Sequence, residues 1–379
     1  MHRMYRGLAI ALVILFLASV ARFYHPGTGF TALIGFPAGH ENEAPAMRGV
    51  PHYDYPDWAS YDGQFYAQRA LDPLLRDPAS DRGMDLAPFR ARRILFSWTA
   101  FALGLGRPVW VIEAYALQNV ACWLILAALL TRWIPPTDAR RLCLWGACLF
   151  SHGMLWSVRF ALLDAPSLVL IAGAVAAVES GFPLLSAALV GIAGLGRETN
   201  LLAAASQPIP RDRRQWARLA AAAVICVLPL LIWEDYLRSI YRSTLFAGTD
   251  QIGVPGIALA DSWRATLVLV KRRGLLSPDG LSLALLASLA VQAAYLLVRR
   301  NHVNPWWRVA VSYAILLLVL DPVLANPRVG AITRVLLPLT VGFNILLASE
   351  LRPSRFWPWF AAGNLHLLAA VAVMPLLPW

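Results

Sequence analysis

The chain has 379 residues, of which 58% are hydrophobic and 15% are charged, whereas soluble domains carry about 25% charged residues. Its repeated apolar runs approach the length that crosses a bilayer. The composition therefore excludes an ordinary soluble protein and predicts an all-α polytopic membrane protein. The formal net charge of +11 comes mostly from arginines in short turns between apolar runs. That pattern predicts membrane lipids, and no nucleic acid, as partners.

The first apolar run covers residues 7–20 and follows two arginines near the start of the chain. Its end resembles the small-residue cleavage site of a signal peptide, so two interpretations are open. Because many apolar runs follow, we favour a retained first transmembrane helix over residues 1–23. With either interpretation, the next segment lies outside the cytoplasm.

The only long polar stretch comes next, and we expect residues 24–108 to form an extracytoplasmic loop containing short helices. Several prolines divide the loop, which argues against a separate large domain. It ends with the short apolar run Ile94–Gly106. Counting this run as a full span would place the arginine-rich turn 132–141 outside, against the positive-inside rule. We therefore predict a juxtamembrane helix at the outer face.

The remaining residues, 109–379, are predicted to form a helical transmembrane bundle, and the whole chain, 1–379, a single membrane domain. Together with the first helix, the bundle gives about eleven spans of the length expected for bilayer-crossing segments. On this topology the arginine-bearing turns face the cytoplasm. The expected spans lie near Val109–Leu130, Leu142–Trp156, Leu163–Val178, Phe182–Leu195, Asn200–Gln207, Trp216–Tyr236, Leu281–Val298, Trp307–Leu320, Ala331–Ser349 and Phe356–Leu377.

Acidic and aromatic side chains are concentrated in residues 53–66 of the predicted loop. Three carboxylates, those of Asp54, Asp57 and Asp62, alternate there with tyrosine, tryptophan and phenylalanine rings. A carboxylate can take a proton from a hydroxyl group, and flat rings provide surfaces for sugars. The segment is therefore the first candidate for a site outside the cytoplasm.

A short helix is predicted to begin just after Asp62. The i, i+3, i+4 and i+7 spacing places Phe65, Tyr66 and Arg69 on the same helix face as Asp62. An alternative role for Asp62 is that of an N-cap, accepting from the amide of Gln64 or Phe65. The two roles are compatible, so both stay open.

A second group of polar residues falls at the predicted outer ends of spans. It consists of Arg159, Asp164, Arg197, Glu198, Asp321, Arg328 and Arg334. Ionisable groups near hydrocarbon are costly and are usually paired or functional. One interpretation is a polar pocket whose arginines hold phosphate, since guanidinium forks match phosphate oxygens. The other is that these residues snorkel or form ion pairs that set the helix ends.

Short motifs in both groups resemble those of the GT-C superfamily of integral-membrane glycosyltransferases. Residues 61–66, Tyr-Asp-Gly-Gln-Phe-Tyr, are similar to the Asp-x-x-x-Tyr element of the first extracytoplasmic loop in that superfamily. Residues 92–96 resemble its juxtamembrane segment, and Gly196-Arg197-Glu198-Thr199 resembles its arginine-containing motif between later helices. The resemblance covers most of the architecture, and it is strongest to bacterial glycopolymer-forming members.

The resemblance implies that Asp62 is the catalytic base and that Arg197 contacts the lipid-linked phosphate. The acidic residue lies farther from the first helix than in many members, so the base assignment stays open among Asp54, Asp57 and Asp62. Some members use a divalent metal, so Mg²⁺ or Mn²⁺ is a possible cofactor. The candidate substrate-binding residues are Asp54, Asp57, Gln64, Tyr66, Arg69, Arg159, Asp164, Arg197, Glu198 and Arg334.

The expected function is transfer of a sugar from a polyprenyl-phosphate donor to a glycan or lipid acceptor. The arginine and alanine bias is typical of a GC-rich bacterial genome. We therefore expect a multi-pass protein of the bacterial cytoplasmic membrane, with its active site facing the periplasm or cell exterior. Two alternatives are a transporter or flippase of a lipid-linked or anionic solute, and a non-catalytic subunit of a polymer-assembly complex. A transporter usually has repeated halves and ionisable groups near the midplane, and neither is evident in the sequence.

Overall fold

The computed structural model describes residues 2–39, 43–56, 60–241, 253–321, 325–326, 331–350 and 352–373. These residues form α-helices, short 3₁₀ helices and one pair of parallel strands, β1 (Phe36–Pro37) and β2 (Asp54–Tyr55). The architecture is all-α, as predicted. The α-helices are α1 (His2–Ala21), α2 (Gly63–Arg69), α3 (Ala87–Arg92), α4 (Leu95–Leu103), α5 (Pro108–Leu130), α6 (Ala139–Leu149), α7 (His152–Arg159), α8 (Asp164–Glu179), α9 (Pro183–Gly196), α10 (Arg213–Tyr241), α11 (Ile257–Arg273), α12 (Pro278–Val298), α13 (Pro305–Val319), α14 (Ala331–Val335), α15 (Leu337–Leu347), α16 (Pro353–Gly363) and α17 (His366–Val373).

Four helices in the described part of the chain are long and apolar enough to cross a membrane: α1, α5, α10 and α12. Shorter apolar helices include α9, α13 and α15. The long helices agree with a membrane-embedded protein, because each reaches the length of about 20 residues that crosses the hydrocarbon layer. Eleven full-length spans are not confirmed.

Three of the predicted spans are each divided into two helices. Leu142–Trp156 is broken between α6 and α7, where Ser151 has extended backbone angles (φ −62°, ψ 149°). Ala331–Ser349 is divided into α14 and α15, and Pro338 lies in the first turn of α15, where a missing N–H is tolerated. Phe356–Leu377 is divided into α16 and α17, and its last residues lie outside the described part.

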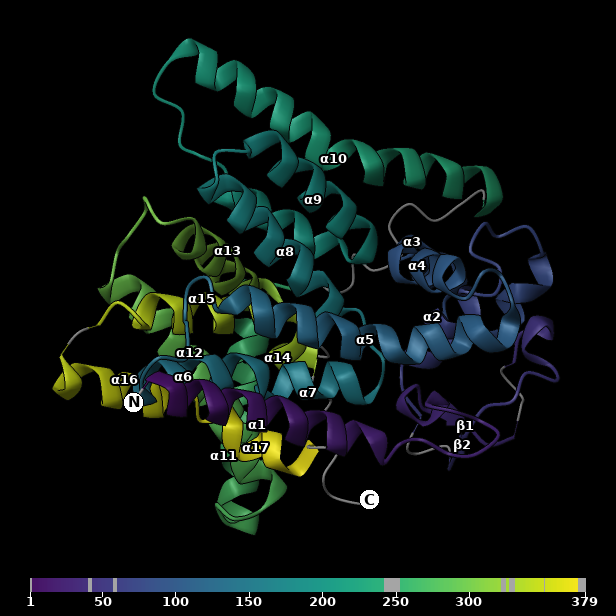
Figure 1. Ribbon diagram of the computed structural model, residues 1–379, viewed down its shortest axis with the longest axis horizontal. Helices are drawn as coiled ribbons and strands as arrows, with labels where there is room; N and C mark the ends of the chain where they lie inside the picture. Colours follow the sequence, from purple (N-terminus) through teal and green to yellow (C-terminus); the bar gives the residue numbers. More distant parts are fainter. Residues whose placement is uncertain are drawn as a thin grey trace.

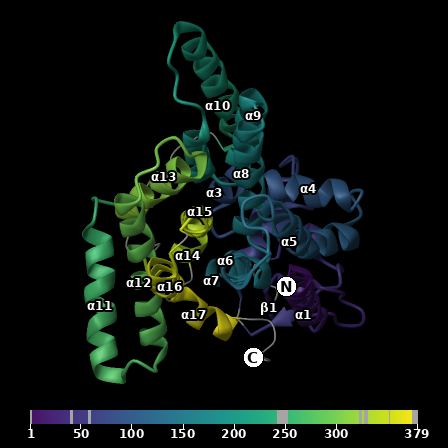
Figure 2. The same cartoon turned by 60° about the vertical axis from the view of Figure 1, so that its left-hand side comes forward.

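Two further segments differ from the sequence prediction. Asn200–Gln207 was expected to be a short span, but it falls largely within a 3₁₀ helix, Glu198–Ser206. The helix α11 was not predicted, because Asp261, Arg264 and its basic last turn interrupt the apolar pattern on which the prediction relied. Figure 2 shows α11 beside α12 at one edge of the bundle.

The two ends of the molecule along its long axis contain different structural elements and different charged residues (Figure 1). The loop strands β1 and β2 and the short helices α2, α3 and α4 lie at one end. The N-terminus, the turn after α12 and the start of α16 lie toward the other end. That second end carries arginine pairs such as Arg299/Arg300 and Arg352/Arg355. The arginine-rich turns thus gather away from the acidic and aromatic loop.

The helix α5 joins several other elements through buried side chains. Trp123 stacks on Phe16 of α1 with ring centroids 3.8 Å apart. The Trp123 Nε1–H donates to the carbonyl of Leu149 at 2.9 Å, and the Asn119 side-chain amide donates to that of Leu162 at 2.9 Å. These bonds satisfy polar groups at the ends of α6 and in the turn before α8, where helix carbonyls lack partners.

The long loop is attached to the bundle at several points. The carboxylate of Glu113 on α5 accepts from the backbone N–H of Phe30 at 2.9 and 3.2 Å. The Trp233 Nε1–H of α10 donates to the Ala91 carbonyl at 2.9 Å, and Glu234 pairs with Arg92. The segment that carries the acidic and aromatic residues therefore has a defined position relative to the helices.

Gly63, the first residue of α2, allows a close backbone contact. A Cβ atom at this position would lie 2.0 Å from the carbonyl oxygen of Phe160. We expect Gly63→Ala to displace α2 and to destabilise the protein by about 1–3 kcal/mol, as overpacking does. Thermal unfolding in detergent measures this loss.

Gly146→Ala in α6 is the matched control, since nothing lies within 4 Å of its added Cβ. It should be neutral or stabilise by up to about 1 kcal/mol through helix propensity. An unchanged unfolding temperature for Gly63→Ala would contradict the close contact.

Candidate functional site

Asp62 lies immediately before α2, at the N-cap position. Its side chain accepts no capping hydrogen bond, because its backbone angles are already helical (φ −51°, ψ −26°). The carboxylate instead pairs with Arg90 of α3, with Oδ1 2.9 Å from Nη2. The side chain of Asp62 is 42% exposed. Of the two roles predicted for Asp62, side-chain capping is wrong.

Arg90 is buried and organises the surroundings of Asp62. It donates to both carboxylate oxygens of Asp85, from Nε at 2.8 Å and from Nη2 at 2.6 Å. Its Nη1 donates to the hydroxyl of Tyr66 at 3.1 Å. Its guanidinium also lies over the Phe65 ring, 4.6 Å from the centroid. Three neighbours thus hold the Arg90 guanidinium beside Asp62, so its position is defined.

The arginines around Asp62 favour its ionised form. Desolvation by the surrounding protein opposes ionisation, but the charges of Arg90 and Arg334 outweigh it. The pKa of the Asp62 carboxyl therefore lies below its ordinary value. A carboxylate in this state is ionised at neutral pH and can accept a proton.

Arg93 contacts both Tyr66 of α2 and Glu198, which lies just after the end of α9. Its Nη1 lies 3.5 Å from the Tyr66 hydroxyl, and its Nε donates to Oε2 of Glu198 at 3.2 Å. Arg92 approaches the other oxygen of Glu198 at 3.7 Å. Glu198 is thus held by two arginines from the loop, which brings α3 against the junction between α9 and the following 3₁₀ helix.

Asp164, the first residue of α8, is buried between two arginines. Arg197 donates to its Oδ1, and Arg334 of α14 donates to its Oδ2 at 2.9 Å. Arg334 also donates to the hydroxyl of Tyr61 at 3.0 Å. A buried carboxylate needs such partners, because an unpaired charge in this environment is costly.

These contacts close into a ring. One row leads from Asp62 to Glu198 through Arg90, Tyr66 and Arg93, and the other leads from Arg197 to Tyr61 through Asp164 and Arg334. The rows meet because Tyr61 precedes Asp62 and Arg197 precedes Glu198 in the chain. We call this set, together with Asp85, the charged ring.

The charges of the charged ring balance. Its four arginines, Arg90, Arg93, Arg197 and Arg334, face four carboxylates, so the formal charges sum to zero. The Oε1 of Glu198, which lies 3.7 Å from Arg92, has no hydrogen bond. Two further buried polar groups also lack one: the Nε of Arg334 in the ring and the Oε1 of Gln64 beside it. Buried polar atoms are nearly always satisfied, so these two are available to a bound molecule or water.

Two predicted substrate-binding arginines, Arg69 and Arg159, lie apart from the charged ring. Arg69 is fully buried and donates to Ser80 at 3.1 Å and to Asp81 at 2.7 Å, so it holds the loop segment that follows α2. Arg159 donates to the Ala32 carbonyl at 3.1 Å and to the Tyr55 hydroxyl at 3.2 Å. These two arginines support the loop and do not contact Asp62.

Asp54 lies in β2 and pairs with His52 at 3.1 Å. Asp57 lies outside the described residues. Of the two described carboxylates considered as the base, Asp62 lies within the charged ring and Asp54 does not. In the described part of the chain, no group of three or more His, Cys, Asp or Glu side chains is arranged to hold a metal ion.

Sequence reasoning missed Arg90, Arg93 and Asp85. The signal was present, because Arg90, Arg92 and Arg93 directly precede the apolar helix α4 on the side predicted to be outside. Basic residues there run against the positive-inside rule. An excess of arginine on the unfavoured side indicates residues that are held for pairing or for binding.

No protein-family model matches the chain, and no curated protein is similar enough in sequence to indicate a relationship. The functional interpretation therefore depends on the geometry of the charged ring and on the motifs within it.

Proposed function

We propose that the protein is a membrane glycosyltransferase of GT-C type that moves a sugar from a polyprenyl-phosphate donor to a glycan or lipid acceptor on the extracytoplasmic side. One observation carries the proposal: a partly exposed, ionised Asp62 lies beside buried arginines at the end of the molecule opposite the arginine-rich turns. Such a pairing of base and cations meets the two needs of sugar transfer from a phosphate.

In the proposed reaction, the acceptor hydroxyl oxygen forms a bond to the anomeric carbon of the sugar. The bond from that carbon to the phosphate oxygen breaks, and its electron pair leaves with the phosphate. Asp62 takes the proton of the hydroxyl group. The buried arginines, among them Arg334 with its unpartnered Nε, stabilise the charge on the leaving phosphate.

Aromatic rings beside Asp62 support a sugar substrate. Tyr61 stacks on Phe160 with ring centroids 4.8 Å apart, and it meets Trp156 edge-on at 5.8 Å. All three side chains are half-buried and come from the loop and from the end of α7. Half-buried rings supply contact area at little entropic cost and retain a face for a ligand.

A reconstituted assay tests the proposal. The purified protein in liposomes is incubated with a panel of polyprenyl-phosphate-linked labelled sugars and with extracted envelope glycans or lipids. Labelled acceptor is the expected product. Movement of the labelled donor across the bilayer without transfer would establish a flippase in place of a transferase.

A second candidate function, a non-catalytic subunit of a polymer-assembly complex, is favoured by the charge balance of the charged ring. Each of its arginines already has a carboxylate partner, as in a network that only stabilises the fold. Co-purification with other assembly proteins, together with no transfer by the isolated chain, would favour this candidate.

The ion pair between Arg90 and Asp62 predicts how the transfer activity depends on pH. In Arg90→Gln the charge that lowers the pKa of Asp62 is removed while desolvation remains, so this pKa should rise. A base must be ionised, and activity is therefore lost as the pH falls through its pKa. The acid limb of the transfer profile should move to higher pH in Arg90→Gln and stay near its original position in Arg90→Lys. Equal shifts in both variants would contradict a charge effect.

A further inference from the structure

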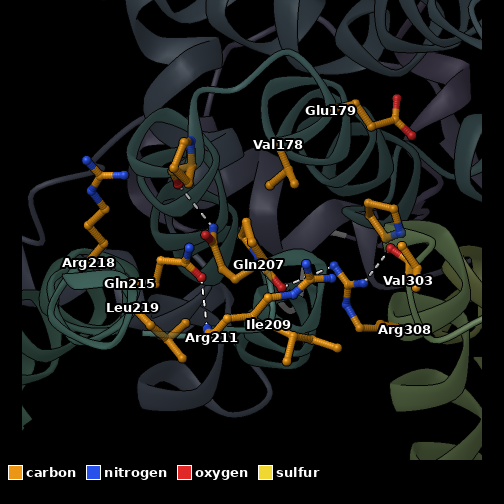
Figure 3. Close-up of a pocket in the computed structure, with 13 residues that line it drawn as sticks. Val178, Glu179, Gln207, Ile209, Arg211, Gln215, Arg218, Leu219, Val303 and Arg308 are labelled. Atoms are coloured by element: carbon orange, nitrogen blue, oxygen red, sulfur yellow. Dashed lines mark hydrogen bonds between the residues drawn. The ribbon is translucent and has the colours of Figure 1, made fainter. Parts of the chain in front are cut away.

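A cavity of about 640 Å³ lies at the end of the molecule opposite the charged ring. It is formed where α8 turns into α9 and where the chain enters α10 and α13, on the side of the arginine-rich turns in Figure 1. Most of its lining is apolar, but Arg211, Arg218 and Arg308 are also among the lining residues (Figure 3). A pocket that combines apolar walls with a few cations suits an amphiphilic anion.

Arg308 builds the wall of this cavity. Its five N–H groups all donate to backbone carbonyls, at 2.7–3.1 Å, in residues 205–207 and 302–303. The side-chain amide of Gln207 donates to the Pro183 carbonyl at 3.1 Å. The cavity therefore has a defined shape. The positive charge of Arg308 still adds to the net charge of the cavity lining, because the backbone carbonyls that it binds carry no formal charge.

Arg211 and Arg218 differ from Arg308 in having free guanidinium groups. Both are exposed, and neither side chain forms a hydrogen bond or ion pair within the described part of the chain. Glu179 is the carboxylate of the lining, and it is engaged by Arg132 at 3.2 Å and by the Trp133 Nε1–H at 2.8 Å. The lining of the cavity thus has a net positive charge, and the guanidinium N–H groups of Arg211 and Arg218 can donate to a ligand.

Three exposed apolar side chains lie within two residues of the lining residues Pro183 and Gln215 in the chain, and we call them the apolar border. Phe182 is 61% exposed, Leu185 is 53% exposed and Trp216 is 61% exposed. They lie on the turn before α9, on α9 and on α10. The helix α10 packs mainly on α9 (Figure 2), and apolar side chains along it such as Val224 and Leu228 are exposed. In a membrane, α10 therefore contacts acyl chains next to the cavity, and exposed tryptophan is favoured at the interface.

We propose that this cavity binds the phosphate headgroup of an anionic phospholipid, with the acyl chains along α9 and α10. Arg211 and Arg218 donate to the phosphate oxygens, since guanidinium groups match them in geometry. The apolar border holds the upper part of the chains. The lipid site lies at the opposite end from the charged ring and is independent of the proposed transferase activity.

Native mass spectrometry of the purified full chain tests this proposal. The protein is titrated with phosphatidylglycerol and, separately, with phosphatidylcholine. We expect R211Q/R218Q to weaken phosphatidylglycerol binding about thirtyfold, because each basic group beside an anionic headgroup contributes about fivefold. Arg308 is left intact, since its bonds shape the cavity.

The matched control is R213Q/R214Q, which removes the same charge from exposed residues at the start of α10 that do not line the cavity. It should change binding by less than about twofold, as expected for screened surface charges. Equal losses in the two double variants, or equal binding of the two lipids, would overturn the site. Displacement of the lipid by equimolar inorganic phosphate would also overturn it, because the ligand would then be free phosphate.

Discussion

Asp62→Asn should lower sugar transfer by about 10²–10⁴-fold, the range that general-base catalysis contributes. The asparagine side chain has nearly the same size and can still accept a hydrogen bond from Arg90, whose Nη2 lies 2.9 Å from Asp62 Oδ1. It cannot take the proton of the acceptor hydroxyl. Initial rates with saturating donor and acceptor measure the loss, and size-exclusion chromatography in detergent shows that the fold is retained.

Asp85→Asn provides a matched control for this loss. Asp85 and Asp62 are exposed to nearly the same extent, 41% and 42%, and both pair with Arg90. Each substitution removes one carboxylate from the same guanidinium, but only one removes the proposed base. We expect Asp85→Asn to retain transfer within about tenfold of the original protein, since it alters only how Arg90 is held. Equal losses in the two variants would show that Asp62 acts only through Arg90.

Asp164→Asn should cause the largest loss of stability, about 3–5 kcal/mol, because it leaves two buried guanidinium groups without a counter-charge. The side chain of Asp164 is 3% exposed and accepts from both Arg197 and Arg334. Titration of mixed micelles with SDS measures the free energy of unfolding. The double variant Asp164→Asn/Arg334→Gln should be more stable than Asp164→Asn alone, because one uncompensated charge is removed.

An exposed ion pair supplies the comparison. Asp261 and Arg264 lie 3.4 Å apart on α11, with side chains 59% and 81% exposed. Asp261→Asn should change the free energy of unfolding by less than about 0.5 kcal/mol, as surface pairs do. A similar loss in the Asp164 and Asp261 variants would contradict the structural role given to Asp164.

The sequence predicted the helical class because apolar runs of bilayer length leave little choice of structure. It also selected Asp62, Asp164, Arg197 and Arg334, which the fold brings into the charged ring, because charges beside long apolar runs are conspicuous in a sequence. The residues that pair with them were harder to predict from the sequence. Arg90 is 28 residues from Asp62 in the chain, and its pairing depends on how the loop folds back over α2.

Helix boundaries were the weakest part of the prediction, for a physical reason. Hydropathy registers whether a segment is apolar, but the break between α6 and α7 depends on the backbone at Ser151, and that between α14 and α15 coincides with a proline in the next helix. The 3₁₀ helix Glu198–Ser206 contains the apolar run 201–205, which was interpreted as part of a short span. Its tighter winding is set by packing against α9 and α13, which sequence periodicity does not report.

The arrangement around Asp164 has a consequence for biosynthesis. Arg197 follows Asp164 after 33 residues, whereas Arg334 follows after 170. The chain is made from its N-terminus. Asp164 can therefore pair with Arg197 early in synthesis, but it can pair with Arg334 only after most of the protein has been inserted. The interval is longer for Tyr61, because 273 residues separate it from Arg334, which donates to its hydroxyl group. The charged ring is therefore completed only after α14 is in place, which makes it one of the last parts of the molecule to assemble.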